Sequence, residues 1–302
     1  MKKNQMMLLL IVIQAAITGC QSNPNKKSNE STQPQTTVVS ENIRFCESTY
    51  PYKGGILIAN FGTKQLNPLN KEGKGYINYY KDGKMSTLIA TDGNLSAPKG
   101  MFIRDNHLFI CDVNKIAVYN LEALQEAPQT ISFPEDDLFI NDLAADGNTL
   151  YASVTNSGRI YQIDIANPSD MNTVTPVKWT EVTGPNGLII DNGTMYIASY
   201  PADGNTTDAN VIYQITNLAN PVAEKFISLS GQYDGIALSA DKKTMYITNW
   251  SPAGISTIDM STRQVTPLIV KENLTGPADI TVANDTMYIP DLPNSRVVIQ
   301  PL

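Results

Sequence analysis

The sequence predicts an all-β fold, a six-bladed β-propeller built from four-stranded antiparallel blades. A short apolar and aromatic segment that ends in a small or polar residue occurs six times, at intervals of about 40–50 residues. A second segment of partly alternating polarity follows each copy, and no segment keeps an apolar period of 3.6. The six copies are residues 57–60, 108–111, 150–153, 195–198, 245–248 and 287–290.

Each repeat also carries the signals expected of a hairpin. Five of the six copies follow a polar turn, for example Asp105-Asn106 or Asn284-Asp285. An apolar inner strand precedes the turn, as in residues 187–190 and 235–238. One such repeat cannot bury both faces of its own sheet, so the repeats are expected to pack around a common axis.

The last repeat ends at Leu302 without a fourth strand. The chain offers a spare apolar strand before the first repeat, around Thr37–Val39. We therefore predict that this N-terminal strand completes the last blade, which closes the ring and removes two exposed sheet edges.

The first 19 residues are predicted to be a signal peptide. Lys2 and Lys3 precede an apolar run that is too short to span a bilayer permanently and that ends in Gly19-Cys20. This ending resembles the bacterial lipoprotein signal, so Cys20 is predicted to become the lipidated N-terminus, anchored in the membrane of the bacterial cell envelope. The alternative is an ordinary secretory signal cut elsewhere. Residues 20–36 are predicted to be a flexible tether, and residues 37–302 the propeller.

Composition excludes several classes of function. The chain has 22 basic and 29 acidic residues, and without Lys2 and Lys3 its net charge falls from −7 to −9. No basic cluster indicates nucleic-acid binding. The single histidine, His107, follows a turn and is expected in a solvated loop, which argues against a Ser-His-Asp triad. Cys46 and Cys111 are expected to be buried thiols rather than a disulfide.

One residue per repeat stands just before the inner strand, and in a propeller these positions converge on the central channel. Four of the six supply carboxylate or amide oxygens, which suit a hard divalent cation with water completing the shell. Calcium is the expected ion, with magnesium, manganese or zinc as alternatives. These six channel positions are Glu47, Lys99, Asn141, Asn186, Asp234 and Ala278.

The local motifs around these positions resemble those of the senescence marker protein/gluconolactonase/luciferin-regenerating enzyme family, six-bladed propellers with a metal in the channel. The matching segments are Pro185-Asn186-Gly187, Asp234-Gly235, Asn141-Asp142 and an early Glu47. The resemblance implies that Glu47, Asn186 and Asp234 bind the metal. It also implies that Asn141 contacts the substrate and that Asp234 acts as the base.

The sequence departs from this family in ways that leave function open. Phe139 stands where many members have a substrate-contacting Arg, and Lys99 adds a cation to the channel. Lys99 could bind an anionic substrate, pair with Glu47 or Asp279, or repel a metal. Two functions therefore remain: a metal-dependent lactonase or esterase, and a non-catalytic propeller that binds a small molecule, glycan or protein. A monomer is expected in both cases.

Three aromatic residues could form a ligand platform on the same face of the ring. They are Tyr200, Tyr233 and Trp250. Packing between blades is the alternative for each of them.

The predicted anchor can be tested at one residue. Cys20→Ala should shift the protein from the membrane fraction to the soluble fraction, because the acylated thiol is removed. Fractionation and mass spectrometry of the mature N-terminus measure this, with Ser22→Ala as a control that should stay in the membrane. Unchanged partitioning, with no mass added at Cys20 in the wild type, would contradict the assignment.

Overall fold

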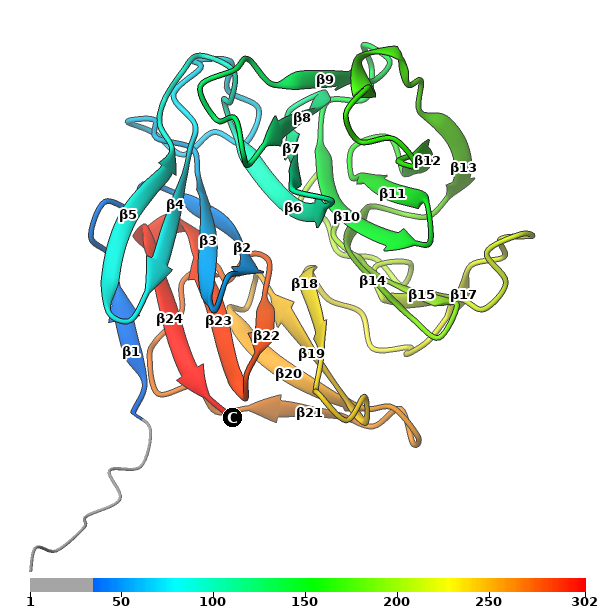
Figure 1. The fold of residues 1–302 in the computed structure, drawn as a ribbon. Coiled ribbons are helices and arrows are strands. Elements are labelled where there is room, and N and C mark those ends of the chain that lie inside the picture. The colour runs from blue at the N-terminus through cyan, green and yellow to red at the C-terminus, as the bar shows by residue number, and fades with distance from the viewer. Residues whose placement is uncertain (1–34) are drawn as a thin grey trace, which may run out of the picture. The chain divides into compact units, whose positions relative to one another are not determined.

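The computed structural model describes residues 35–302, which form six four-stranded antiparallel sheets arranged as blades around a ring (Figure 1). Two 3₁₀ turns, Met171–Thr173 and Leu292–Asn294, are the only helical elements of this part of the chain. The predicted six-bladed propeller is confirmed. The predicted signal peptide, Cys20 and most of the predicted tether lie outside the described residues. No helix within 35–302 is long and apolar enough to cross a membrane.

The blades follow one another along the chain, each beginning with its innermost strand. Blade 1 comprises β2 (Cys46–Tyr52), β3 (Gly55–Asn60), β4 (Tyr76–Lys81) and β5 (Lys84–Ile89). Blade 2 comprises β6 (Pro98–Arg104), β7 (His107–Asp112), β8 (Lys115–Asn120) and β9 (Gln129–Ser132). Blade 3 comprises β10 (Ile140–Asp146), β11 (Thr149–Val154), β12 (Arg159–Asp164) and β13 (Val177–Glu181).

The second half of the ring repeats this order. Blade 4 comprises β14 (Pro185–Asp191), β15 (Thr194–Ser199), β16 (Ile212–Ile215) and β17 (Glu224–Lys225). Blade 5 comprises β18 (Tyr233–Leu238), β19 (Thr244–Asn249), β20 (Gly254–Asp259) and β21 (Val265–Leu268). Blade 6 comprises β22 (Thr281–Ala283), β23 (Thr286–Asp291), β24 (Arg296–Pro301) and the N-terminal β1 (Thr37–Val39).

The ring is closed by the N-terminal strand, as predicted. β1 pairs antiparallel with β24, with Val38 opposite Val298 and Val39 opposite Val297 (Figure 1). Val39 packs in an apolar cluster with Cys46 and Ile58 of blade 1, so the first and last blades share a core. Strand β24 therefore has no unpaired edge, which removes a site for aggregation.

The residues of the turns determine the conformation of the hairpins that join the inner and second strands. Asp105 and Asn106, and likewise Asn284 and Asp285, have positive φ at both central positions. This geometry belongs to type I′ turns, whose twist matches the twist of the flanking strands and which Asn, Asp and Gly adopt most readily. The polar turns therefore join inner and second strands as predicted.

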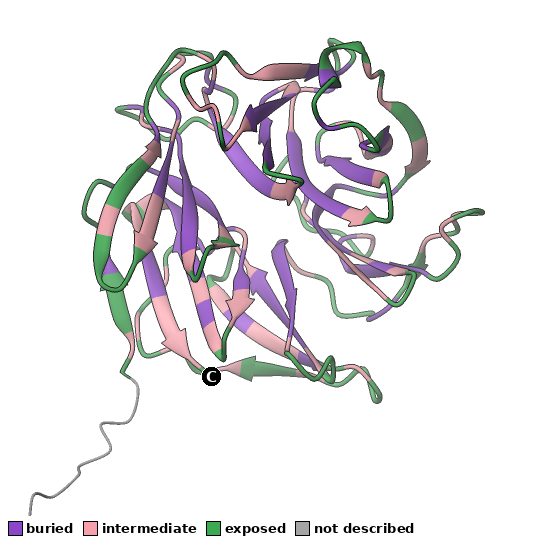
Figure 2. Ribbon diagram, in the orientation of Figure 1, coloured by how far each residue is buried: buried purple, intermediate pink, exposed green. Residues whose placement is uncertain are grey.

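Apolar side chains fill the spaces between neighbouring blades. Figure 2 shows burial along the inner and second strands and exposure along outer strands such as β13 and β21. In the cluster between blades 1 and 2, Leu57 packs with Ile110, and in the cluster between blades 2 and 3, Phe109 packs with Leu143. The interiors of single blades are thin, so stability depends on the contacts between blades.

The strand register corrects one detail of the repeat alignment. Cys46 pairs with Asn60 in blade 1, whereas Pro98 pairs with Asp112 in blade 2. The first copy of the repeated apolar segment, the signature segment, therefore corresponds to residues 56–59 rather than 57–60. Ile56, Leu57 and Ile58 are all fully buried, so this strand has no alternation of polarity that could mark its register in the sequence.

We expect that removal of residues 1–39 destabilises the propeller, because it exposes the edge of β24 and removes the buried Val39 side chain. Burial of one such side chain contributes about 2 kcal/mol. Urea unfolding followed by circular dichroism measures the loss. A matched variant that lacks only residues 1–34 keeps β1 and should unfold like the full chain; equal stability of the two variants would show that β1 does not close the ring.

Candidate functional site in the central channel

The inner strands bring five of the six channel positions to one cavity of about 360 Å³. Its lining includes Glu47, Lys99, Asn141, Asn186 and Asp234. The predicted convergence is therefore present, although neither metal binding nor catalysis follows from it. Ala278, the sixth position, is fully buried and carries no polar group.

A register shift between the first and second strands of the blade, which form its inner hairpin, directs these side chains toward the cavity. In blade 4, Pro185 pairs with Ser199 and the next regular pair is Leu188 with Ile197, so one extra residue lies on β14. Equivalent shifts occur in blades 1, 2, 3 and 5. A β-bulge of this kind leaves a residue unpaired and turns its side chain out of the regular alternation. The channel position lies within each bulge.

In blades 3 and 5, a hydroxyl residue on the second strand stabilises the bulge. In blade 3, the Ser153 hydroxyl accepts a hydrogen bond from the Asp142 amide (3.0 Å) and donates one to the Asn186 carbonyl of blade 4 (2.6 Å). In blade 5, the Thr248 hydroxyl accepts from the Gly235 amide and donates to the Ala278 carbonyl, both at 2.7 Å. These hydroxyl groups join each bulge to the next blade.

The glycines of the two Gly-containing motifs permit close packing of neighbouring inner strands. Gly187 and Gly235 lie within strands β14 and β18 and not in turns. A Cβ on Gly187 would lie 2.5 Å from the Asp234 carbonyl oxygen, and one on Gly235 would lie 2.5 Å from the Ile280 amide nitrogen. Any larger residue would push adjacent blades apart and widen the channel.

Two carboxylate oxygens of the cavity are buried without a partner. Glu47 Oε2 and Asp234 Oδ1 make no hydrogen bond within residues 35–302. Their side chains belong to residues that are 4% and 8% exposed. Buried polar atoms are nearly always paired, so two such atoms in one cavity indicate a missing partner. A cation, a water molecule or a ligand donor would each satisfy them.

Burial and mutual repulsion favour the protonated forms of these acids. Burial, with the charge of Asp279, raises the pKa of Asp234 to about 8, while the Asn186 amide and Lys99 act in the opposite direction. Burial, and then the charges of Asp234 and Asp279, raise the pKa of Glu47 well above its ordinary value. A positive ion between them would reverse both shifts.

Two further acids lie directly after channel positions, and the motifs did not reveal their place in the channel. Asp142 Oδ2 accepts a hydrogen bond from the Leu188 amide of the next blade at 2.7 Å. Asp279 accepts from the Ser48 hydroxyl at 2.6 Å and from the Ile280 amide at 2.7 Å. Burial raises the pKa of Asp279 to about 6. These hydrogen-bonded acids connect neighbouring blades. Their charges, when ionised, make the electrostatic potential in the cavity more negative.

Lys99 is fully buried at the cavity wall and is not paired with an acid. Its Nζ donates hydrogen bonds to the Pro68 and Ala97 carbonyls at 3.1 and 3.0 Å, and it lies 4.9 Å from the centre of the Phe139 ring. Burial lowers the pKa of Lys99, and the nearby charge of Glu47 opposes this. No ion pair of the described chain includes Lys99, so the suggested pairing with Glu47 or Asp279 was wrong. The two backbone carbonyls and the nearby aromatic rings stabilise the ammonium group of Lys99 in the absence of a paired acid.

The three aromatic candidates divide between the two expected roles. Tyr200 and Trp250 line the cavity, as does Phe61. Tyr233 instead packs in the apolar cluster between blades 4 and 5. Phe61, which also lies 5.6 Å from Lys99 Nζ, was missed because it directly follows a buried strand and carries no polar signal.

The donor set limits what the cavity can bind. Within residues 35–302, no three His, Cys, Asp or Glu side chains are arranged to hold a metal ion. A cation in the channel would therefore depend on amide oxygens and water in addition to Glu47 and Asp234. This combination fits a hard ion such as calcium better than a transition metal.

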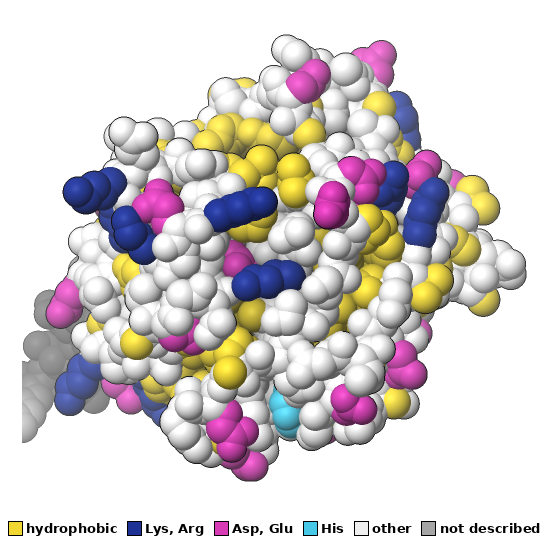
Figure 3. All heavy atoms as spheres, turned by 90° about the horizontal axis from the view of Figure 1, so that it is seen from above, with side chains coloured by type: hydrophobic (Ala, Val, Ile, Leu, Met, Phe, Trp, Pro, Cys, Tyr) yellow, Lys and Arg dark blue, Asp and Glu magenta, His cyan; other side chains and the backbone are white. Residues whose placement is uncertain are grey.

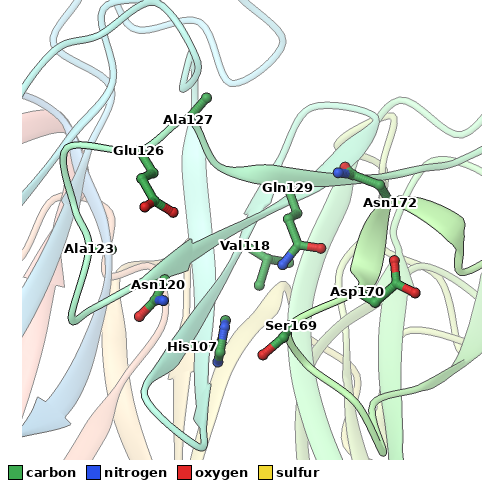
Figure 4. A pocket seen from close by; sticks show the side chains of 10 residues that line it. All are labelled: His107, Val118, Asn120, Ala123, Glu126, Ala127, Gln129, Ser169, Asp170 and Asn172. Carbon is green, nitrogen blue, oxygen red and sulfur yellow. The ribbon is translucent and has the colours of Figure 1, made fainter.

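His107 lies at a different cavity, which contradicts the expectation of a solvated loop residue. It is the first residue of β7 and is 7% exposed, and its Nδ1 lies 2.8 Å from the Asp105 carbonyl oxygen. The turn before it is only two residues long, so the ring already lies within the sheet. Figure 4 shows it beside Ser169, among the residues that line a second cavity. The volume of this cavity is about 420 Å³. This cavity does not contain any of the predicted site residues.

Cys46 and Cys111 are buried free thiols, as predicted. Burial raises the pKa of Cys46 and of Cys111, so neither is activated as a nucleophile. On the side face in Figure 3, basic and acidic side chains are interspersed. That face does not carry the concentrated basic charge of a nucleic-acid interface.

Comparisons with known proteins define the class of this protein by fold. No family model and no curated protein matches the sequence, so membership of the lactonase-like family stays a prediction. Among solved structures, the chain is similar to one from a nidogen/laminin complex, with TM-score 0.61, 15% identity, and 77% of this chain and 87% of that chain covered.

Two bacterial structures are similar to the same degree. A protein of unknown function from Bacteroides thetaiotaomicron gives TM-score 0.60 and 14% identity over 86% of this chain and 70% of that chain. A catalytically inactive virginiamycin B lyase from Staphylococcus aureus, solved with quinupristin, gives TM-score 0.55 and 14% identity over 89% of this chain and 99% of that chain. At these identities the likeness establishes the propeller fold alone.

The raised pKa of Asp234 predicts a pH dependence of stability in chelator. Folded Asp234 keeps its proton up to about pH 8, whereas the unfolded carboxyl group loses it near pH ~4. The folded state therefore binds more protons between these values, and the unfolding free energy should fall as pH rises through them.

The variant Asp234→Asn, which cannot titrate, should lack this contribution. Urea unfolding at pH 5, 6.5 and 8 should show the wild type losing stability relative to the variant. Parallel pH profiles would show that Asp234 is already ionised in the folded protein.

Proposed function

We propose that this propeller is a divalent-cation-dependent hydrolase of lactones or esters, with its site in the channel cavity. The observation that carries the proposal is the pair of buried carboxylate oxygens, Glu47 Oε2 and Asp234 Oδ1, which lack a partner and lie in one cavity. Hard cations are bound by such oxygens. The order of the motifs on blades 1, 3, 4 and 5 supports the same conclusion.

The residues present fit a calcium-like ion. Glu47 and Asp234 would supply charge, Asn186 would supply an amide oxygen, and water would complete the shell. Asn141, on the neighbouring blade, lines the same cavity and is free to contact a substrate, because its side chain makes no hydrogen bond within 35–302. When bound, the cation would supply Lewis acidity to a carbonyl group.

The protein side of the chemistry follows from Asp234. Burial and the charge of Asp279 raise the pKa of Asp234 without a cation, and a bound cation would lower it again, so the carboxylate would be ionised at neutral pH. One of its oxygens would then bind the cation, and the other could accept a proton from an attacking water. The Asn141 amide could donate a hydrogen bond to the substrate oxygen.

A non-catalytic binding module is the second candidate. It is favoured by the small number of acids at the cavity and by the structural neighbour from a laminin complex, which binds a protein partner. In this function Lys99 and Asn141 would contact the ligand directly. In both cases we propose that the propeller acts at the cell envelope, held there by the predicted lipid at Cys20.

Calcium should raise the melting temperature of the wild type and bind with one-to-one stoichiometry. At a hundredfold excess over the dissociation constant, binding to the native state adds about 2.7 kcal/mol to stability. Asp234→Asn should lose the calcium-dependent shift and any lactonase activity, because the charge and the base are removed together. Scanning and titration calorimetry, and a chromogenic ester assay, make these measurements.

The control is Asp146→Asn, which alters an exposed acid at the other end of an inner strand and should respond to calcium like the wild type. If calorimetry detects no binding of calcium, magnesium, manganese or zinc, and chelator leaves melting unchanged, the metal-dependent function fails. The binding module would then be the better account.

A further inference from the structure

The cavity has a polar base and an apolar wall. Acid and amide groups come from the channel positions at the starts of the inner strands. Apart from Lys99, the other residues that line the cavity are apolar or aromatic. The wall includes Phe61, Leu66, Pro68, Phe139, Tyr200 and Trp250. A ligand that reaches the polar base must therefore lie against an apolar surface along the rest of its length.

Much of this wall belongs to the loop between β3 and β4, residues 61–75, and contacts with its neighbours hold that loop in place. Arg44 donates hydrogen bonds to the Thr63 carbonyl at 2.9 Å and the Lys64 carbonyl at 2.6 Å. Lys99 donates to the Pro68 carbonyl, and Asn70 donates to the Ser96 carbonyl at 3.0 Å. The apolar wall is therefore formed before any ligand binds, which reduces the entropic cost of binding.

The charged side chain in the wall, Lys99, already has hydrogen-bond partners within the protein. Two of the three N–H groups of Lys99 are used by carbonyls, and the Phe61 and Phe139 rings lie close to its Nζ. Lys99 therefore offers at most one donor to a ligand. Leu66, by contrast, is a large apolar side chain that lines the cavity and is 38% exposed. Covering it with an apolar group removes that surface from water.

We propose that the substrates are lactones or esters that carry an apolar alkyl or aryl substituent, rather than polyhydroxylated sugar lactones. This inference rests on the proposed hydrolytic function and names its substrate class. The carbonyl group would lie at the base, beside Asn141 and Asp234, with the substituent against Leu66 and Trp250. Hydroxyl groups in that position would lose their water and meet few polar groups in the wall, chiefly the Tyr200 hydroxyl, the Trp250 indole N–H and one Lys99 N–H.

A substrate series tests the proposal. The kcat/KM of the calcium-loaded protein is measured for γ-butyrolactone, for γ-lactones with alkyl chains of two, four and six carbons, and for δ-gluconolactone. Each added methylene that reaches the wall should raise kcat/KM by about fourfold. The hydroxylated lactone should be the poorest substrate. Equal rates along the series, or preference for the hydroxylated lactone, would overturn the substrate class while leaving the hydrolase intact.

Leu66 and Leu69 provide a matched pair of variants. They lie in the same loop and are 38% and 39% exposed, but only Leu66 lines the cavity. Leu66→Asn should lower kcat/KM for the six-carbon lactone about tenfold more than it lowers kcat/KM for γ-butyrolactone. Leu69→Asn should leave both values unchanged. Similar effects of the two variants on every substrate would show that the loop is perturbed as a whole and would contradict the proposal.

A binding measurement separates the substrate class from catalysis. Trp179→Phe leaves Trp250 as the single tryptophan, so its fluorescence reports on the cavity. Titration with γ-lactams, which resist hydrolysis, should give dissociation constants that fall about fourfold per methylene. If alkyl lactams bind in this order and no lactone is hydrolysed, the ligand class stands and the hydrolytic function fails. Lactam binding that does not depend on chain length would overturn the ligand class.

Discussion

The crowding of six inner strands around one axis is the constraint on which the rest of this structure depends. Neighbouring blades approach so closely that Gly187 and Gly235 have no room for a Cβ. In five of the six blades, a register shift in the inner hairpin interrupts the alternation of side chains and directs one side chain toward the axis. The hydroxyl groups of Ser153 and Thr248 join each bulge to the next blade. One packing requirement therefore produces both the ring and the site.

The same crowding sets the electrostatics. Side chains that point at the axis are removed from water, and removal of a carboxylate from water raises its pKa. Asp142 and Asp279 offset part of this cost with backbone and hydroxyl donors. Glu47 and Asp234 each keep a buried oxygen without a partner. Lys99 pairs with neither acid, because its Nζ donates hydrogen bonds to backbone carbonyls and lies close to aromatic rings. The cavity thus combines two buried acids that lack hydrogen-bond partners with a largely apolar lining, which is a poor arrangement for stability alone.

Fold similarity does not select between hydrolysis and binding. Propellers with about 15% identity to this chain include a virginiamycin B lyase and a chain of a nidogen/laminin complex. What they share with this chain is the fold, and a fold does not by itself determine function. For this chain, the distribution of polar groups at the base and apolar groups at the mouth is the more informative property.

The sequence by itself determined the six repeats, the hairpin turns, closure by Thr37–Val39 and the convergence of Glu47, Asn141, Asn186 and Asp234, because each of these depends on local chemistry repeated at a fixed interval. Only the tertiary structure decided what depends on neighbouring blades. The one-residue shift of the first signature arises within a uniformly buried strand, and the burial of His107 depends on its sheet. The partners of Lys99 come from a loop of another blade and from the residue just before its own strand, and the apolar wall is assembled from segments far apart in the chain. Such contacts leave no periodic signal in the sequence, since only the closed ring brings their residues together.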